Sequence, residues 1–163
     1  ISDLNFTELV QQTGGEFEEK FAARRLDLVT HIPDGRLIIQ ADGRRLWRIL
    51  ENLYNNACKY AMEGSRVYVD LKEEDGMAVF TIKNVSESPL NIDASELTER
   101  FVRGDVARTT EGSGLGLSIA KNLTLLQKGT FDIIIDGDLF KALVAFPVKK
   151  PEDPQEKQPD IPE

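Results

Sequence analysis

The stretch GSGLGLSIAKNL, residues 112–123, places three glycines in five residues directly before a helical pattern. Each glycine ordered there costs up to about 1 kcal/mol relative to alanine, which indicates that something approaches the backbone closely. The first N–H groups of a helix lack intrahelical partners, and the helix dipole is positive at that end. A bound phosphate is one explanation, and a tight turn before a packed helix is the alternative.

The glycine spacing excludes two common phosphate loops. The chain has no Gly-Lys-Ser/Thr, so it carries no P-loop, and its glycines follow GxGxG rather than GxGxxG. Polar residues at 108–111 also precede the glycines, where a dinucleotide-binding fold needs a strand. The glycine segment is therefore a phosphate-binding candidate of another kind.

A second stretch, ILENLYNNACKYA, carries three asparagines inside a predicted helix, where asparagine is disfavoured. At about 100° per residue, Asn52 and Asn56 share one face, and Lys59 and Tyr60 follow one turn later. Amide oxygens there suit a hard cation such as Mg²⁺, and a lysine ammonium suits a phosphate. A solvated helix face is the alternative, and we interpret Asn55, on another face, in that way.

Periodicity and turn residues define the elements that must position these side chains. We expect helices over 5–26, 42–61 and 115–128, and strands over 26–32, 36–40, 67–71, 77–84 and 130–147, the last run folded into a hairpin at Asp136-Gly137. The last helix shows an apolar stripe of Leu115, Ile119, Leu123 and Leu126, which Ala120 supports. Helices interspersed with hairpin-linked strands indicate an α+β two-layer sandwich, in which three helices cover one face of a mixed, mostly antiparallel sheet.

Composition limits the class of protein. At 163 residues with 40% hydrophobic and 29% charged residues, the chain fits one globular domain, which we place at 1–149. Residues 150–163 are rich in proline and charge, so we expect a disordered tail. The net charge of -8 argues against a nucleic-acid or anionic-membrane partner. The single cysteine, Cys58, cannot form an internal disulfide, and we expect it to be a packed residue.

Three motifs together resemble a known family. NLYNNACKYA resembles the N box, N-x-x-x-N-A-x-K-Y, of the ATP-binding domain of sensor histidine kinases. RFVRGD, residues 100–105, and GSGLGL resemble that family's F box and G2 box, in the same order. The resemblance covers roughly residues 5–147. It implies the Bergerat fold, a two-layer sandwich shared with gyrase and Hsp90-like chaperones, which agrees with the architecture expected from periodicity.

The resemblance also implies ligands and roles. ATP and Mg²⁺ are the expected cofactors. Asn56 is implied to ligate Mg²⁺, Asn52 to support the metal and phosphates, Lys59 to contact phosphate, and Tyr60 to pack near the adenine. Phe101 and Arg103 are implied to belong to a mobile lid over the nucleotide. The segment implied to receive the phosphates consists of Gly112, Ser113, Gly114, Leu115 and Gly116.

One motif differs from the family pattern. The G1 box, D-x-G-x-G, normally follows the hairpin strand, and its aspartate accepts from the adenine amino group. Here the corresponding residues are NVSES, which begin at Asn84. The Asn84 amide oxygen is expected to accept the same hydrogen bond more weakly than a carboxylate, with altered affinity or base selectivity. The alternative is that Asn84 only ends its strand.

The resemblance implies a protein-histidine kinase that is incomplete in this chain. No catalytic residue is expected within it, because the phosphoacceptor histidine lies on a separate dimerisation domain of the parent protein and a response regulator acts downstream. The only histidine, His31, follows no acceptor pattern, and we expect a structural or surface role. We expect a monomeric, cytoplasmic domain without direct membrane contact, in a parent protein that is a membrane-bound sensor.

Three other functions compete with this interpretation. ATP-hydrolysing relatives use a glutamate as base where this chain has Asn52, and the neighbouring Glu51 projects about 100° away. An ATP-driven machine is therefore disfavoured. A nucleotide-binding or docking module without catalysis would explain the altered G1 box. A serine kinase of the anti-sigma-factor type is a third possibility, against which the RFVRGD motif argues.

Overall fold

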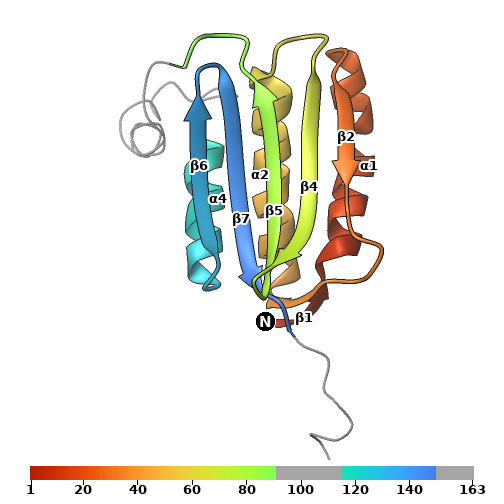
Figure 1. Ribbon diagram of the computed structural model, residues 1–163, viewed down its shortest axis with the longest axis vertical. Helices are drawn as coiled ribbons and strands as arrows, with labels where there is room; N and C mark the ends of the chain where they lie inside the picture. The colour runs from red at the N-terminus through yellow and green to blue at the C-terminus, as the bar shows by residue number, and fades with distance from the viewer. Residues whose placement is uncertain (91–114, 150–163) are drawn as a thin grey trace, which may run out of the picture.

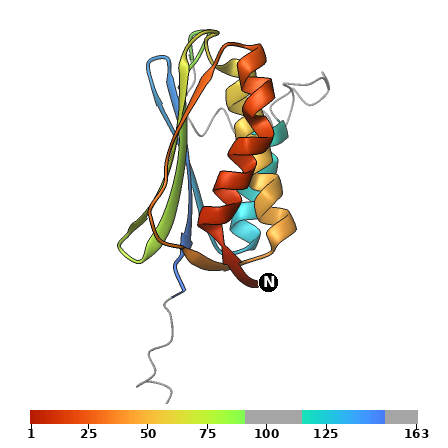
Figure 2. The ribbon, with the colours of Figure 1, turned by 90° about the vertical axis from the view of Figure 1, so that its right-hand side faces the viewer.

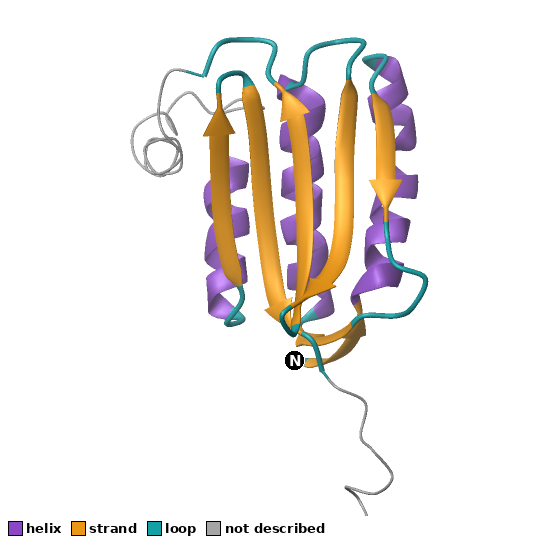
Figure 3. Ribbon diagram, viewed as in Figure 1, coloured by secondary structure: helices purple, strands orange, loops and turns teal. Residues whose placement is uncertain are grey.

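Three helices of the described chain lie on one face of a five-stranded sheet (Figures 1 and 3). The structure is a computed structural model that describes residues 1–90 and 115–149. Its elements, in chain order, are β1 (Ser2–Asn5), α1 (Phe6–Ala23), β2 (Asp27–His31), β3 (Ile38–Ala41), α2 (Gly43–Tyr60), β4 (Arg66–Glu74), β5 (Met77–Val85), α4 (Leu115–Leu126), β6 (Thr130–Asp136) and β7 (Leu139–Pro147).

The main sheet has the strand order β2-β4-β5-β7-β6. β2 is parallel to β4, and the other neighbours are antiparallel, which confirms the expected mixed, mostly antiparallel sheet. The parallel pair is possible because α2 lies between its two strands in the chain and carries the crossover. Figure 2 shows all three helices on the same side of the sheet, so the other face is not covered by a helix of the described ranges.

A second, two-stranded sheet pairs β1 with β3 in antiparallel fashion. The short strand β1 was not expected from the sequence, where the first helix was the first element. The run over 36–40 therefore does not pair with its neighbour over 26–32, although a turn separates them. A four-residue strand whose partner is more than thirty residues away leaves no local signal in the sequence.

Side-chain caps begin the first two helices. The Asn5 side chain accepts from the Glu8 N–H at the start of α1. At the start of α2, the Asp42 carboxylate accepts from the Arg44 and Arg45 N–H groups at 2.9 and 3.2 Å, and these bonds hold the pKa of that carboxyl below its usual range. Caps of this kind fix where each helix begins, and therefore which residues reach its far end.

The face of α4 that packs on the core differs from the predicted stripe. Leu117 and Ala120 are buried, whereas Leu126 is 66% exposed and Ile119 and Leu123 are half-buried. Polar side chains complete the buried face, since Thr124 donates to the Ala120 carbonyl and Gln127 accepts from the Asp42 N–H at 2.7 Å. The stripe was correct at Ala120 and in part at Leu123, which packs against the core, and it was wrong at Leu126. In that last part of the helix Thr124 and Gln127, whose hydrogen bonds are satisfied internally, occupy the inward positions.

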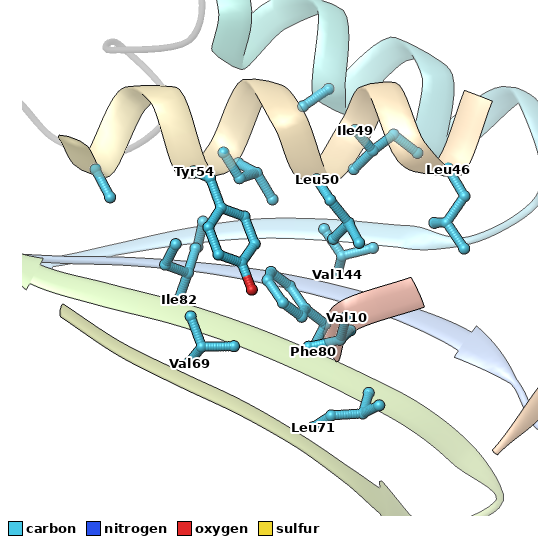
Figure 4. Close-up of a cluster of buried hydrophobic side chains, with 14 of the residues drawn as sticks. Val10, Leu46, Ile49, Leu50, Tyr54, Val69, Leu71, Phe80, Ile82 and Val144 are labelled. Carbon is cyan, nitrogen blue, oxygen red and sulfur yellow. The ribbon is translucent and has the colours of Figure 1, made fainter. Parts of the chain in front are cut away.

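The core between the layers is built on aromatic rings. Tyr54 of α2 stacks on Phe17 with ring centroids 5.4 Å apart and contacts Phe80 of β5 at 6.1 Å. Phe80 in turn lies 6.3 Å from Phe6. Figure 4 shows Tyr54 pointing from α2 toward the sheet, with its hydroxyl oxygen among hydrocarbon side chains. The hydroxyl has no hydrogen-bond partner among the described residues, and burial raises its pKa.

Removal of this hydroxyl is expected to leave the protein as stable or more stable. In Tyr54→Phe the ring packing is kept, and a buried donor without a partner is removed, which relieves about 1–2 kcal/mol of unfavourable desolvation. Urea denaturation followed by circular dichroism measures the change in the free energy of unfolding. A loss above about 1 kcal/mol would contradict the prediction and indicate that a buried water satisfies the hydroxyl.

Candidate functional site

Helices α2 and α4 meet where the sequence predicted a shared ligand. A methyl group on Gly116, in the first turn of α4, would lie 3.5 Å from Asn52 Oδ1 and 3.7 Å from Asn52 Cβ. The Asn52 amide therefore lies directly against the backbone of the α4 N-terminal turn. An amide side chain of α2 and the bare main chain of α4 therefore lie next to each other.

Two amides of the site contain buried donors without acceptors. Within the described residues, the amide nitrogens of Asn52 and Asn84 have no hydrogen-bond partner. Asn84 is only 3% exposed and lies at the end of β5, so its amide belongs to the floor of the helix-covered face. Native proteins rarely leave buried donors unpaired, and a bound ligand or ordered water is the usual explanation.

The other N-box side chains lie on the last turns of α2. Asn56 and Tyr60 are half-buried, and Lys59 is exposed. Burial raises the pKa of the Tyr60 hydroxyl, which keeps that group neutral. Lys59 thus presents its ammonium to solvent beside two partly buried groups, and such an arrangement is suited to an anionic ligand that stays partly exposed.

The end of α2 is tied to the end of β5 by main-chain hydrogen bonds. The Met62 N–H donates to the Val85 carbonyl at 2.9 Å, and the Glu87 N–H donates to the Tyr60 carbonyl at 2.9 Å. An isolated bridge between Ala61 and Ser86 continues this pairing. These contacts hold the last turn of α2, with Tyr60, next to the strand end that carries Asn84.

Arg24, which no sequence motif singled out, reinforces this junction. Its guanidinium donates to the Cys58 carbonyl and, at 3.0 Å, to the Lys59 carbonyl, and it lies 3.6 Å from Glu87 Oε2. It satisfies carbonyls in the last turn of α2 that have no intrahelical donor. In the sequence Arg24 is only a basic residue at the end of a helix, because the carbonyls it binds are more than thirty residues away.

Loss of the Arg24 contacts is expected to destabilise the fold measurably. Arg24→Ala should lower the free energy of unfolding by about 1–3 kcal/mol, because two carbonyls lose a charged donor. Arg24→Lys should recover less than half of the loss, since an ammonium cannot reproduce the guanidinium fork. Chemical denaturation provides the measurement.

The neighbouring Arg25 supplies the control for this comparison. Arg25 pairs with Glu63 at 3.6 Å, and the two side chains are 75% and 49% exposed. Arg25→Ala should therefore change stability by less than about 0.5 kcal/mol. Equal losses from Arg24→Ala and Arg25→Ala would contradict the assigned role of Arg24.

Asn55, the third asparagine of α2, contacts the first helix instead of the site. Its Oδ1 accepts from Lys20 Nζ at 3.4 Å, and Cys58, one turn later, lies with Sγ 3.6 Å from the Lys20 carbonyl oxygen. The interpretation of Asn55 as a solvated face is therefore modified, because the residue is half-buried at the contact between α1 and α2. Cys58 is also half-buried at this contact, as expected for a packed residue.

His31 lies on the opposite side of the sheet from the site. It is paired in register with Asp70, and its Nδ1 is 3.2 Å from Asp70 Oδ1. Along β4, Val67, Val69 and Leu71 are buried toward the helices, so Asp70 projects from the other face. The sheet therefore separates His31 from Asn52 and Asn84.

Several predicted site residues lie outside the described part of the chain. These are Phe101, Arg103, Gly112, Ser113 and Gly114, and for Leu115 only the main chain is described. Within 1–90 and 115–149, no group of three or more His, Cys, Asp or Glu residues is placed to hold a metal ion. The helices in these two ranges are each too short or too polar to span a lipid bilayer.

Comparison with known sequences identifies related proteins. A sequence profile described as histidine kinase-, DNA gyrase B-, and HSP90-like ATPase matches residues 41–157. The sensor histidine kinase RppB of Synechocystis is 30% identical over 128 residues, which are 77% of this chain and 28% of RppB. BaeS of Escherichia coli, a signal transduction histidine-protein kinase, is 31% identical over 77% of this chain and 27% of its own length. The chain thus spans about a quarter of these relatives.

Solved structures share the fold. The catalytic domain of histidine kinase ThkA superposes with a TM-score of 0.76 at 22% identity, covering 90% of this chain and 95% of that one. Full-length ShkA in complex with AMPPNP gives 0.75 at 21% identity, over 94% of this chain and 32% of ShkA. ThkA in complex with the response regulator protein TrrA superposes with a TM-score of 0.73 at 21% identity, covering 91% of this chain and 42% of that one. The expected two-layer sandwich is confirmed.

Proposed function

Because this chain belongs to the histidine kinase-, DNA gyrase B-, and HSP90-like ATPase family, we propose that it binds Mg–ATP and presents the γ-phosphate for transfer to a histidine of a sensor kinase. The observation that carries the proposal is the contact between Asn52 and Gly116, which places an amide against the bare first turn of α4. The unpaired amide nitrogens of Asn52 and Asn84 support it, because each donor requires an acceptor.

The proposed phosphate end of the site lies between α2 and α4. The side chains fit a magnesium nucleotide, since Asn56 offers an amide oxygen one turn from Asn52, and Mg²⁺ prefers oxygen ligands together with waters and phosphates. Asn56 would hold the ion, which neutralises phosphate charge when bound. Asn52 then orients the phosphates, Lys59 contacts them as a point charge, and Gly112, Ser113, Gly114, Leu115 and Gly116 supply main-chain N–H donors.

The proposed base end lies where α2 meets β5. Tyr60 packs near the base, and Asn84 hydrogen-bonds its polar edge. The main-chain bonds between Tyr60 and Glu87 and between Met62 and Val85 keep these two groups adjacent. Phe101 and Arg103 are proposed to close over the nucleotide. This division, with amides and glycines at the phosphates and a buried amide at the base, follows the chemistry of the two ends of ATP.

The phosphoacceptor is proposed to come from another domain. The chain has one histidine, and His31 lies across the sheet from the proposed site. The domain would therefore contribute positioning and charge neutralisation, while a histidine of a dimerisation domain in the parent protein supplies the nucleophile. A response regulator would act downstream, as the ThkA–TrrA complex illustrates for a relative. We place the domain on the cytosolic side of a membrane-bound sensor, where ATP is available.

Phosphate transfer tests the proposal directly. The chain is incubated with Mg–ATP that carries a radiolabelled γ-phosphate and with the histidine-containing dimerisation domain of its parent protein. We expect label on the acceptor domain, in an acid-labile bond, and none when the acceptor histidine is replaced by glutamine. ATP binding without transfer would favour a docking module, and transfer to a serine would favour an anti-sigma-factor type of kinase.

A further inference from the structure

Asn84 is a polar residue in a row of hydrocarbon side chains. Alternate residues of β5 are buried under the helices, and Phe80, Ile82 and Asn84 follow one another on that face. Asn84 is only 3% exposed, almost as little as Ile82 at 2%. An amide at such a position requires hydrogen-bond partners, because no water replaces them freely.

The described residues do not supply an acceptor for this amide. The Asn84 nitrogen has no partner among them. Nearby acceptors bind other donors, since Ser86 Oγ accepts from the Ser88 N–H and the Tyr60 carbonyl, at the end of α2, accepts from the Glu87 N–H. The amide therefore has a free donor at the end of β5, beside the last turn of α2, where the base of a nucleotide is proposed to lie.

An amide recognises a purine edge differently from a carboxylate. A carboxylate only accepts hydrogen bonds, whereas an amide carries an acceptor and a donor side by side. Adenine presents an amino donor next to a ring-nitrogen acceptor, and guanine presents a carbonyl acceptor next to a ring N–H donor. Rotation of the amide by half a turn matches either edge, whereas a carboxylate has no donor for the guanine carbonyl.

We propose that Asn84 makes the base-binding end of this site accept guanosine triphosphate as well as adenosine triphosphate. The inference rests on the proposed nucleotide site and adds the class of base that the site admits. The free donor of Asn84 supports it, because an acceptor such as the guanine carbonyl satisfies that donor as well as a ring nitrogen of adenine does. Asn84 is then the residue that sets base selectivity.

Calorimetric titration of the chain with Mg–ATP and with Mg–GTP tests the proposal. In the wild-type protein the two dissociation constants should agree within about tenfold, since each purine makes the same number of hydrogen bonds. In Asn84→Asp the ratio of the GTP to the ATP constant should rise by roughly 10–100-fold, because a buried carboxylate opposes the guanine carbonyl. The titrations are run near pH 8, because burial raises the pKa of the introduced carboxyl and its protonated form would imitate an amide.

Two controls separate base recognition from charge and from folding. Asn55→Asp introduces the same charge on α2 at the contact with Lys20, and it should leave the GTP-to-ATP ratio unchanged. Asn84→Ala removes both the donor and the acceptor of the amide. It should weaken the binding of ATP and of GTP by the same factor, so the GTP-to-ATP ratio again stays constant. Circular dichroism confirms that each variant is folded, and Asn84→Ala keeps the inference testable if Asn84→Asp does not fold.

The outcomes distinguish this inference from the proposed function. If the wild type binds ATP but binds GTP more than about 100-fold more weakly, the proposal that the site accepts both purines is wrong, and the proposed ATP site is unaffected. If Asn84→Asp leaves the GTP-to-ATP ratio of dissociation constants unchanged, Asn84 does not set base selectivity. The same conclusion follows if Asn84→Ala weakens the binding of the two nucleotides by different factors. If neither nucleotide binds to the folded wild-type chain, the proposed function itself is wrong.

Discussion

Asn56→Ala is expected to weaken the binding of Mg–ATP by roughly 30–150-fold, since a polar contact to a charged ligand contributes about 2–3 kcal/mol. The proposed contact is between the Asn56 amide oxygen and the magnesium ion, so the loss should depend on the metal. In the presence of a chelator, the wild type and the variant should bind free ATP with nearly equal affinity. Isothermal titration with and without Mg²⁺ measures both quantities.

Asn55 provides a matched control on the same helix. Asn55→Ala deletes the same amide one residue earlier, where it accepts from Lys20 of α1. We expect its nucleotide affinity to stay within about twofold of the wild type, although stability decreases by a few tenths of a kcal/mol. A large loss of Mg–ATP affinity in Asn55→Ala, with none in Asn56→Ala, would mean that the wrong face of α2 has been assigned to the ligand.

Gly129→Ala is expected to lower the free energy of unfolding by about 2–3 kcal/mol, the largest stability effect we predict. A methyl group there would lie 2.7 Å from a ring carbon of Phe146 and 2.9 Å from the Ala145 carbonyl oxygen. The backbone oxygen belongs to β7, in the middle of the sheet, and cannot move without disturbing the pairing with β5 and β6. Urea denaturation measures the loss.

Replacement by alanine of a glycine that has open space beside it should raise the free energy of unfolding instead of lowering it. Gly15 lies inside α1, and a methyl group on it would contact nothing within 4 Å. Gly15→Ala should therefore raise the free energy of unfolding by about 0.5–1 kcal/mol, because alanine has less backbone freedom to lose. Equal effects of the two substitutions would show that glycine at 129 is not required by the close approach to β7.

The helix that carries the asparagines was predictable because its signals are local. Asp42 caps α2, and apolar residues recur along it at helical spacing and are buried, namely Leu46, Ile49, Leu50, Leu53 and Ala57. The face bearing Asn52 and Asn56 follows directly from that stripe at 100° per residue. A local cap and a strong periodicity are therefore enough to predict both the helix and the orientation of its polar face.

Features that depend on distant contacts were not predictable. β1 pairs with β3, which follows α1 and β2 in the chain, and Arg24 binds carbonyls at the end of α2. Neither contact can be recognised from the residues next to it in the sequence. The apolar stripe of α4 was wrong at Leu126, because Thr124 and Gln127 are buried through hydrogen bonds that sequence periodicity does not reveal. Gly129 follows the expected helix end at residue 128, but Lys128 is the residue that adopts the left-handed conformation, with φ at 65°. Glycine is needed at 129 because its backbone lies close to Phe146 and Ala145.

The arrangement of strand ends has a consequence for how a partner domain is reached. Residue 148, which follows β7, bridges to β3, and β3 pairs with β1. These segments gather at one end of the sheet, while β5, which carries Asn84 near its last residue, ends at the other (Figure 1). Gly43 at the start of α2 and Asn56 are separated by about 20 Å at 1.5 Å per residue. If the proposed function holds, a segment that enters the fold at β1 starts about 20 Å from the proposed magnesium ligand, and an acceptor histidine has to reach the far end of α2.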